Sequence, residues 1–277
     1  MKIALVQVAS PADESPTDRR ARVGRMVAAA AGADLVVLPE LWAPGYFAFD
    51  RYAEYAESLT GPTVTAARAW ARELGSHLHL GSVVERDAQG RLFNTAVLLA
   101  PDGSLVHTYR KVHVFGHASR EAALLTPGDR LAVAAAPWGQ VAATTCYDLR
   151  FPELWRDLVD RGAQTVITPA AWPAARREHW RLFTTARAVE QQVLLIACNA
   201  VGVQGDGVEL GGHSRVVDPW GTVLVEAGTD EGVTRCEVDP GIVAQVRAAF
   251  PVLADRRWPP ATPPAAPDPT AEALTGP

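Results

Sequence analysis

Short apolar runs of strand length alternate along the chain with segments in which apolar residues recur at helical spacing. Residues 2–9 and 34–39 have the pattern of strands, and residues 18–31 and 62–74 have the pattern of helices. The four consecutive apolar residues at 35–38 predict a strand that is buried on both faces. This alternation is typical of a layered α/β protein.

The middle of the chain contains strand-like runs joined by tight turns. Three successive strands are expected, at residues 77–84, 94–100 and 105–109. The segments 100–103, 136–139 and 218–221 each have proline in the second position and glycine in the fourth, which is the chemistry of a type I turn. Because strands joined by such turns run antiparallel, we expect a mixed sheet and not a purely parallel one.

The second half repeats this order of strands and helices. Strands are expected at residues 141–145, 165–169, 193–198, 214–217 and 222–226. Helices are expected at residues 152–161, 178–192 and 241–249. The same mixture of elements therefore extends along the chain to residue 249.

The composition fits one large domain at residues 1–258. Of the 277 residues, 48% are hydrophobic, which is enough to bury a substantial core. Residues 259–277 carry seven of the 21 prolines together with Ala, Thr and Asp, and such a composition cannot build a core. We expect this tail to be extended or disordered, or to lie across a partner subunit.

Charge and cysteine content exclude several classes of function. The formal net charge of −5 gives no attraction for nucleic acid or for an anionic membrane. No apolar run approaches the roughly 20 residues that span a bilayer. Three cysteines, at 146, 198 and 236, form neither a disulfide framework nor a closely spaced zinc pair. The sequence therefore predicts a cytoplasmic protein that binds neither nucleic acid nor membrane.

Cys146 is a candidate nucleophile because it follows an apolar strand and precedes a helix. A residue on such a tight turn projects from the sheet, beside backbone N–H groups that can bind an oxyanion. The alternative is a buried structural cysteine, which behaves as a small apolar residue; Cys198 and Cys236 have that character. A thiol with a pKa near about 8.5 also needs a base to attack at neutral pH.

Glu40 and Lys111 are the candidates for the base and for the cation. Glu40 follows a strand that is apolar on both faces, so its pKa is expected to be raised toward neutrality. Lys111 follows another strand, where its ammonium could stabilise charge on a substrate oxygen. His77 and His79, two apart on one strand, have no carboxylate or cysteine nearby to complete a metal site.

Three segments together resemble the signatures of the nitrilase, or carbon-nitrogen hydrolase, superfamily. They are LPELW at 38–42, YRKVHVF at 109–115 and CYDLRFPEL at 146–154, in the family's order and spacing. The likeness continues through ARAVEQQ at 186–192 and GHSRVVDPWG at 212–221, and it covers the chain to about residue 251. The resemblance implies a four-layer αββα sandwich, and subunits that pair through helices as a homodimer.

The resemblance also implies a Glu-Lys-Cys triad, which falls on Glu40, Lys111 and Cys146. A second glutamate, usually found before a Pro-Gly-Asp sequence, corresponds to Glu121. Glu40 is expected to accept the thiol proton as Cys146 attacks an amide carbonyl, while Lys111 and the Tyr147 N–H stabilise the oxyanion. A thioester intermediate is then hydrolysed, without a metal or an organic cofactor.

The string CYDLRFPEL looks like the amidase branches that include omega-amidase and deaminated-glutathione amidase, whereas true nitrilases usually carry Cys-Trp-Glu. The segment 169–173 is similar to bacterial omega-amidase-like members, which act on monoamides of dicarboxylates. Such a substrate needs a cation for its distal carboxylate. Three arginines are candidates that the sequence does not rank: Arg150, Arg176 and Arg177. Trp172 and Tyr46 are expected to wall the pocket.

Other functions remain open at this stage. Within the same enzyme class, the substrate could be an N-carbamoyl amino acid, deaminated glutathione, an N-acylated amine or a nitrile. A different class is a nitrilase-like domain kept as a binding or regulatory partner. The presence of all three triad residues argues against that last alternative.

Overall fold

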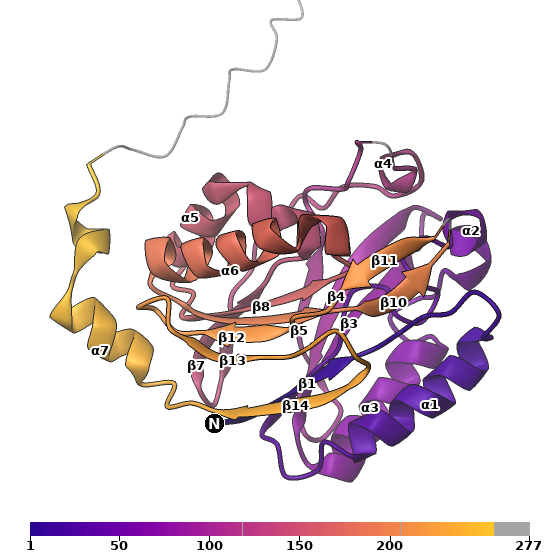
Figure 1. Ribbon diagram of the computed structural model, residues 1–277, viewed down its shortest axis with the longest axis horizontal. Coiled ribbons are helices and arrows are strands. Elements are labelled where there is room, and N and C mark those ends of the chain that lie inside the picture. Colours follow the sequence, from indigo (N-terminus) through magenta and orange to yellow (C-terminus); the bar gives the residue numbers. More distant parts are fainter. Residues whose placement is uncertain (118, 206, 258–277) are drawn as a thin grey trace, which may run out of the picture.

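The computed structural model describes residues 1–117, 119–205 and 207–257 (Figure 1). The expected boundary at residue 258 and the expected tail at 259–277 lie outside these residues. The helices are α1 (Pro16–Ala28), α2 (Tyr52–Tyr55), α3 (Pro62–Leu74), α4 (Glu121–Leu124), α5 (Pro152–Asp160), α6 (Arg177–Gln191) and α7 (Ile242–Ala249). Short 3₁₀ helices are η1 (Phe49–Arg51), η2 (Cys146–Arg150), η3 (Ala174–Arg176) and η4 (Val252–Asp255).

Within the described residues, the strands form two six-stranded sheets and one hairpin. The first sheet has the order β14 (Gly232–Glu237), β1 (Lys2–Gln7), β2 (Leu35–Val37), β3 (His77–Arg86), β4 (Leu92–Leu99) and β5 (Leu105–Arg110). The second has the order β13 (Val223–Glu226), β12 (Arg215–Val217), β9 (Leu194–Asn199), β8 (Thr165–Ala170), β7 (Gly139–Ala143) and β6 (Ala134–Ala136). The hairpin joins β10 (Val201–Gln204) to β11 (Val208–Gly211).

The two sheets share one pairing pattern. In the first sheet, β14–β1 is antiparallel, β1–β2 and β2–β3 are parallel, and β3–β4 and β4–β5 are antiparallel. From β6 to β13 the second sheet has the same succession of directions. The mixed sheet expected from the turn chemistry is therefore present twice.

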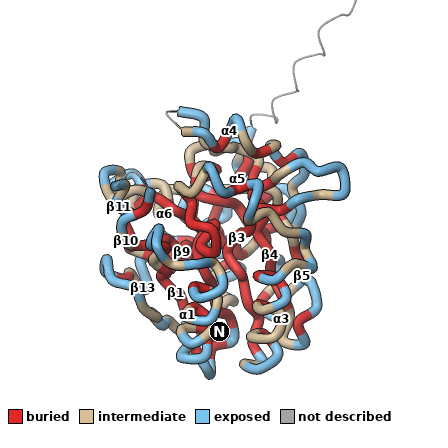
Figure 2. Tube along the Cα trace, turned by 90° about the vertical axis from the view of Figure 1, so that its right-hand side faces the viewer, coloured by how far each residue is buried: buried red, intermediate tan, exposed pale blue. Residues whose placement is uncertain are grey.

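Helices cover the outer face of each sheet, which gives four layers (Figure 1). Val23 of α1 and Val64 of α3 pack on the first sheet, and Leu158 of α5 packs on the second. Between the sheets, apolar side chains from both meet, including Leu5 and Ile196. The buried positions lie mainly along strands such as β3, β4 and β9 (Figure 2). This is the αββα sandwich expected from the sequence.

Helix α3 has the bounds that the sequence predicts. Pro62 begins it, where a missing N–H costs no hydrogen bond, and Gly75 ends it in the left-handed region with φ 62°. The β10–β11 hairpin was not expected, and the tight turn after Cys146 is the 3₁₀ helix η2. No helix in the described part of the chain is long and apolar enough to cross a membrane.

Candidate active site

The residues singled out in the sequence meet where strands of the two sheets end. Glu40 follows β2 and Lys111 follows β5, both in the first sheet, whereas Cys146 follows β7 and Ala171 follows β8 in the second. Since the carboxyl ends of parallel strands lie at one edge of a sheet, each sheet supplies one half of the cluster. The site is thus assembled across the sandwich.

The backbone around Glu40 is held by close packing. A Cβ at Gly81 of β3 would stand 1.8 Å from the Pro39 carbonyl oxygen, so only glycine allows this approach. Leu41, directly after Glu40, has a φ of 44°, and Cys146 has a φ of 47°. Non-glycine residues rarely occupy this left-handed region, and strained positions of this kind cluster at functional sites.

Lys111 is fully buried between two carboxylates. Its Nζ donates to Glu40 Oε1 at 2.9 Å and to both carboxylate oxygens of Glu121 at 3.0 Å. Burial alone would lower the pKa of Lys111, but Glu121 and Glu40 hold that pKa well above its ordinary value. Lys111 is therefore a charged ammonium whose side chain is completely buried.

Glu121, which the sequence predicts as the second glutamate, accepts hydrogen bonds from four groups. Besides Lys111, it accepts the Tyr46 hydroxyl at 3.0 Å, the Phe115 N–H at 2.7 Å and the Asn94 side-chain amide at 3.2 Å. Such full coordination stabilises a buried carboxylate and fixes its position. Asn94 and Phe115 were not singled out in the sequence.

Glu40 has both oxygens engaged and lies at the centre of the cluster. Oε1 accepts from Lys111 and from Asn94 Nδ2 at 2.8 Å, and Oε2 accepts the Ala171 N–H at 2.9 Å. Burial raises the pKa of Glu40, with Lys111 opposing the rise and Glu121 adding to it. A carboxylate with a raised pKa can exchange protons near neutrality.

Cys146 lies beside this cluster and is itself almost completely buried. Burial raises the pKa of the thiol well above its ordinary value, and the negative charge of Glu40 raises it further. Lys111 and the Ala171 N–H act in the opposite direction. The resting side chain is therefore a neutral thiol next to a carboxylate.

Asp148 connects the turn that carries Cys146 to the end of β5. Its carboxylate accepts the Thr145 N–H at 2.9 Å, the Tyr109 hydroxyl at 2.7 Å and the His113 N–H at 3.0 Å. The His113 ring lies 2.8 Å from the same carboxylate and stacks on Phe151 at 3.7 Å. This network fixes the position of the thiol relative to the strand that precedes Lys111.

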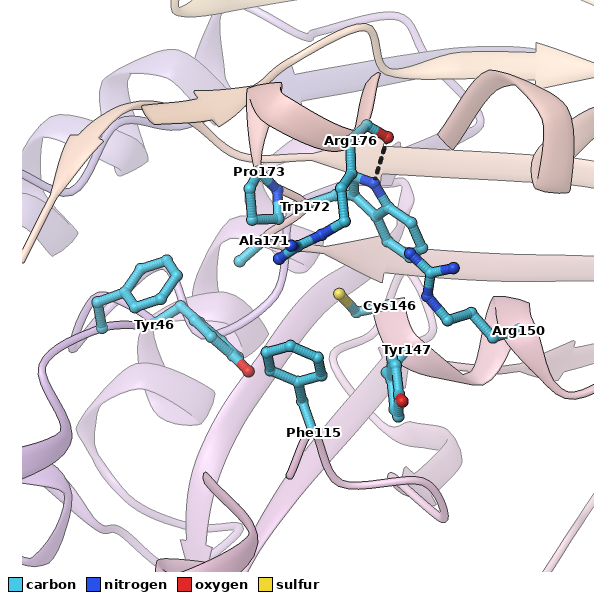
Figure 3. A pocket seen from close by; sticks show the side chains of 10 residues that line it. Tyr46, Phe115, Cys146, Tyr147, Arg150, Ala171, Trp172, Pro173 and Arg176 are labelled. Carbon is cyan, nitrogen blue, oxygen red and sulfur yellow. Dashed lines mark hydrogen bonds between the residues drawn. The ribbon is translucent and has the colours of Figure 1, made fainter. Parts of the chain in front are cut away.

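A pocket of about 360 Å³, including its opening to solvent, leads to Cys146 (Figure 3). The sulfur lies among the side chains of Tyr46, Phe115 and Trp172, as Figure 3 shows. Ten residues line the pocket: Tyr46, Phe47, Phe115, Cys146, Tyr147, Arg150, Ala171, Trp172, Pro173 and Arg176. The expected wall residues Tyr46 and Trp172 are among them, as is Tyr147, expected to bind substrate through its N–H, whereas Phe47 and Phe115 were missed.

Two of the three candidate arginines reach this pocket. Arg150 lies over the rings of Trp172 and Phe183, at 4.8 and 5.0 Å, and Arg176 carries its guanidinium along the pocket wall (Figure 3). Within the described residues, neither guanidinium forms an ion pair with a carboxylate. Burial lowers the pKa of Arg150, and nearby Arg176 lowers it further. Arg177 does not line the pocket.

Comparisons with known proteins identify the family. The model of the family described as carbon-nitrogen hydrolase matches residues 2–248. A 2-oxoglutaramate amidase from Paenarthrobacter nicotinovorans is 39% identical over 264 residues, covering 93% of this chain and 90% of that protein. The human omega-amidase NIT2 is 34% identical over 263 residues, covering 92% and 95%.

A solved structure agrees with the fold. Saccharomyces cerevisiae Nit3, described as a member of branch 10 of the nitrilase superfamily, superposes with a TM-score of 0.84 at 30% identity. The superposition covers 93% of this chain and 97% of that one. The chain therefore belongs to the carbon-nitrogen hydrolase family, within the nitrilase superfamily, and is an amidohydrolase that acts on non-peptide C–N bonds.

Proposed function

We propose that the protein releases ammonia from the amide of a small carboxylic acid, with Cys146 as nucleophile and Glu40 as general base. Lys111 stabilises the oxyanion together with the Tyr147 N–H, and Glu121 holds Lys111 in place. The contact that supports these roles best is the buried chain from Glu121 through Lys111 to Glu40, at 3.0 and 2.9 Å.

The reaction begins as Cys146 Sγ attacks the amide carbon and its proton passes to Glu40. The carbonyl oxygen gains negative charge, which Lys111 neutralises in a region of low dielectric. The tetrahedral intermediate then breaks its C–N bond, and Glu40 returns the proton to the departing ammonia. Glu40 next takes a proton from water, whose oxygen attacks the thioester carbon, and the C–S bond breaks to give the acid and the thiol.

The raised pKa values of Glu40 and Cys146 explain why base and nucleophile act together. A buried thiolate beside an ionised Glu40 would place two negative charges next to each other, in addition to Glu121. Proton transfer during the attack avoids that state, because one charge moves from the carboxylate to the substrate oxygen. Lys111 then has to stabilise only one new anion, the substrate oxyanion, because Glu40 is neutral once it has taken the thiol proton.

The substrate we propose carries a carboxylate besides its amide, as 2-oxoglutaramate does. The guanidinium groups of Arg150 and Arg176 support this, since both lie at the pocket and neither has a carboxylate partner among the described residues, so an anion would compensate them. The other walls are largely aromatic, which suits a short carbon chain between the two polar ends. Two relatives named as 2-oxoglutaramate amidases, one from Bacillus subtilis, agree with this choice.

We also propose that two copies of the chain pair through the outer surface of α6. Four large apolar side chains lie exposed there and on the segments next to it: Leu182, Val189, Trp220 and Phe250. Trp220 and Phe250 stack at 6.0 Å, and a Cβ on Gly221 would touch Val189, so the residues form one surface. A second copy would remove this apolar area from water.

Two further expectations are retained as proposals. Residues 1–258 act as a single catalytic domain, because both sheets contribute to one site. The protein works in a reducing compartment such as the cytoplasm, because the proposed chemistry requires the Cys146 thiol in its reduced form.

Ammonia release tests the proposed function. The panel contains 2-oxoglutaramate, succinamate, N-carbamoyl-β-alanine and a simple nitrile, all of which yield ammonia, with Cys146→Ala as the control. Deaminated glutathione is added, and its hydrolysis is followed by the dipeptide amine that it releases, because it yields no ammonia. We expect release from a dicarboxylate monoamide, absent in the variant. Release only from the carbamoyl compound or the nitrile would replace the proposed substrate, and activity that persists in Cys146→Ala would refute the nucleophile.

A further inference from the structure

A chain of buried hydrogen bonds crosses between the sheets close to the site. Gln7 is the last residue of β1 in the first sheet, and its Oε1 accepts from the Ser214 hydroxyl at 2.7 Å and the Ser214 N–H at 2.9 Å. Ser214, in the second sheet's segment before β12, accepts the Asn199 N–H at 2.9 Å. All three residues are at most 2% exposed.

Asn199 in turn holds the loop that follows β8. Its Oδ1 accepts the Trp172 N–H at 2.7 Å, and its Nδ2 donates to the Trp172 carbonyl at 3.2 Å and to the Gly212 carbonyl at 2.8 Å. One side chain thereby binds both backbone groups of Trp172. Asn199 is not among the residues that line the pocket, and its side-chain hydrogen bonds to a lining residue go to the Trp172 backbone.

The residue before Trp172 supplies the group that reaches Glu40. The Ala171 N–H donates to Glu40 Oε2 at 2.9 Å and acts to lower the pKa of the Cys146 thiol. The Trp172 N–H belongs to the peptide that follows Ala171, so the Asn199 hydrogen bond restrains the backbone from which the Ala171 N–H projects. Glu40 is on the first sheet and Ala171 on the second, so the contact depends on how the two sheets sit against each other.

We propose that Asn199 is a positioning residue for the reaction, which aligns the Ala171 N–H with Glu40 and Cys146 by anchoring the loop to Gln7 through Ser214. This inference rests on the proposed roles of Glu40 and Cys146. Geometry of this kind matters because a displacement of about 1 Å at reacting groups can cost about a hundredfold in rate. The aromatic wall formed by Trp172 moves with the same peptide.

The test uses a reagent that does not depend on the substrate. Iodoacetamide alkylates a thiol: an S–C bond forms, iodide leaves and the thiol proton passes to the base. The rate at Cys146 is measured against pH by mass spectrometry in the full chain, with Cys146→Ala as the blank. The titratable groups that face Glu40 are Lys111, Glu121, Cys146, Tyr46 and Tyr52, and all of them are retained in the Asn199 and Ser214 variants.

The variants are Asn199→Ala, Ser214→Ala and the pair together, with Ser76→Ala as the matched control. Ser76 is buried, donates to the Ala33 carbonyl at 2.6 Å and does not line the pocket, so it reports the loss of a buried hydroxyl outside the site. We expect alkylation of Cys146 to slow about a hundredfold in Asn199→Ala and about tenfold in Ser214→Ala, with no change in Ser76→Ala.

The pH profile separates positioning from loss of stability. In Asn199→Ala, the Ala171 N–H no longer points at Glu40, so the charged form of Glu40 loses a hydrogen-bond donor and the pKa of Glu40 rises. The pH at which alkylation is half-maximal should therefore also rise. The double variant should be no slower than Asn199→Ala, because both substitutions break one chain.

Three results are distinguished. An Asn199→Ala protein that folds and alkylates within twofold of the wild type, with the same profile, would overturn the inference. If that variant does not fold, an unchanged rate in Ser214→Ala would overturn it equally. Alkylation of wild-type Cys146 that shows no dependence on Glu40, compared with Glu40→Gln, would instead refute the proposed function.

Discussion

Tyr46 donates its hydroxyl to Glu121 at 3.0 Å while its ring forms part of the pocket wall. Burial, followed by the charge of Glu121, raises the pKa of Tyr46 well above its ordinary value, so it remains a donor at all working pH values. One side chain thus contacts both the substrate space and the carboxylate that holds Lys111.

Tyr46→Phe separates these two contributions. The ring stays, so the KM should change little, whereas Glu121 loses one donor and the kcat should fall about tenfold, as expected for a hydrogen bond to a charged group. Steady-state ammonia release measures both constants. A large rise in KM with unchanged kcat would show that the hydroxyl serves the substrate and not Glu121.

Glu40→Gln should abolish turnover without unfolding the protein. The amide fills the same space and can still accept from Lys111, but it cannot take the thiol proton, so the kcat should fall about a thousandfold. Thermal unfolding and ammonia release together test this. Retention of more than a tenth of the activity would exclude Glu40 as the base.

Lys111→Met is expected to affect stability as well as activity. It leaves Glu40 and Glu121 buried together without their cation, and removing one partner of a buried ion pair costs about 3–5 kcal/mol. The Tm should therefore drop by roughly 10 °C, more than in Glu40→Gln. Equal melting temperatures for the two variants would contradict the central place given to Lys111.

Arg150→Ala and Arg176→Ala should raise the KM for a carboxylated amide by about 10- to 100-fold. The kcat/KM for a neutral amide of similar length should change much less, because no ion pair is lost. Arg177→Ala is the matched control, being adjacent in sequence but outside the pocket. Equal losses on both amides would mean that the two arginines shape the pocket without binding the carboxylate.

Because His79 is buried, we expect the free energy of unfolding to decrease at acidic pH. His79 is fully buried, and its Nε2 has no partner among the residues that the structure describes. Burial lowers its pKa to about 3, with His107 adding to the effect. The unfolded chain binds this proton near pH 6.5, so the stability contributed by neutral His79 is complete above that pH. It is lost as the pH falls toward 3, at about 1.4 kcal/mol per unit.

His79→Asn removes this titration and retains an acceptor for the Gly81 N–H. Between about pH 6.5 and pH 5, the free energy of unfolding should fall by about 2 kcal/mol more in the wild type than in the variant. Urea denaturation at the two pH values gives the difference. Parallel losses would show that His79 takes up its proton as readily in the folded state as in the unfolded chain.

Charged substitutions on the exposed apolar surface beside α6 test the proposed dimer. Trp220→Asp combined with Phe250→Asp should give a monomer by light scattering, because two charges cannot be buried without partners. Leu105→Asp, on an exposed apolar residue of β5, is the control and should leave the dimer intact. A wild-type protein that is monomeric would refute the proposal directly.

Glu40, Lys111 and Cys146 could be singled out because each follows a predicted strand, and the resemblance to the three nitrilase signatures joined them into one triad. Asn94 could not, because it lies within β4 and resembles any polar residue in a strand. Only the pairing of β4 with β5, through the Lys111 N–H to the Asn94 carbonyl at 2.8 Å, brings it beside Lys111.

The three candidate arginines show a second limit on what the sequence can predict about the site. Arg176 and Arg177 are adjacent, and which one reaches the pocket depends on where η3 ends and α6 begins. A shift of one residue turns a helical side chain by about 100°, and sequence patterns do not locate helix ends that finely. The β10–β11 hairpin was missed because Gly202, Gly205 and Gly207 interrupt its alternation.

The matching strand order of the two sheets also bears on how the enzyme loses activity. The strand ladders run within each sheet, whereas Glu40 follows a strand of the first sheet and Cys146 follows a strand of the second. A small slip of one sheet over the other would separate the proposed base from the proposed nucleophile while every ladder stayed intact. Inactivation by heat can therefore precede the loss of circular dichroism signal, and it can reverse on cooling.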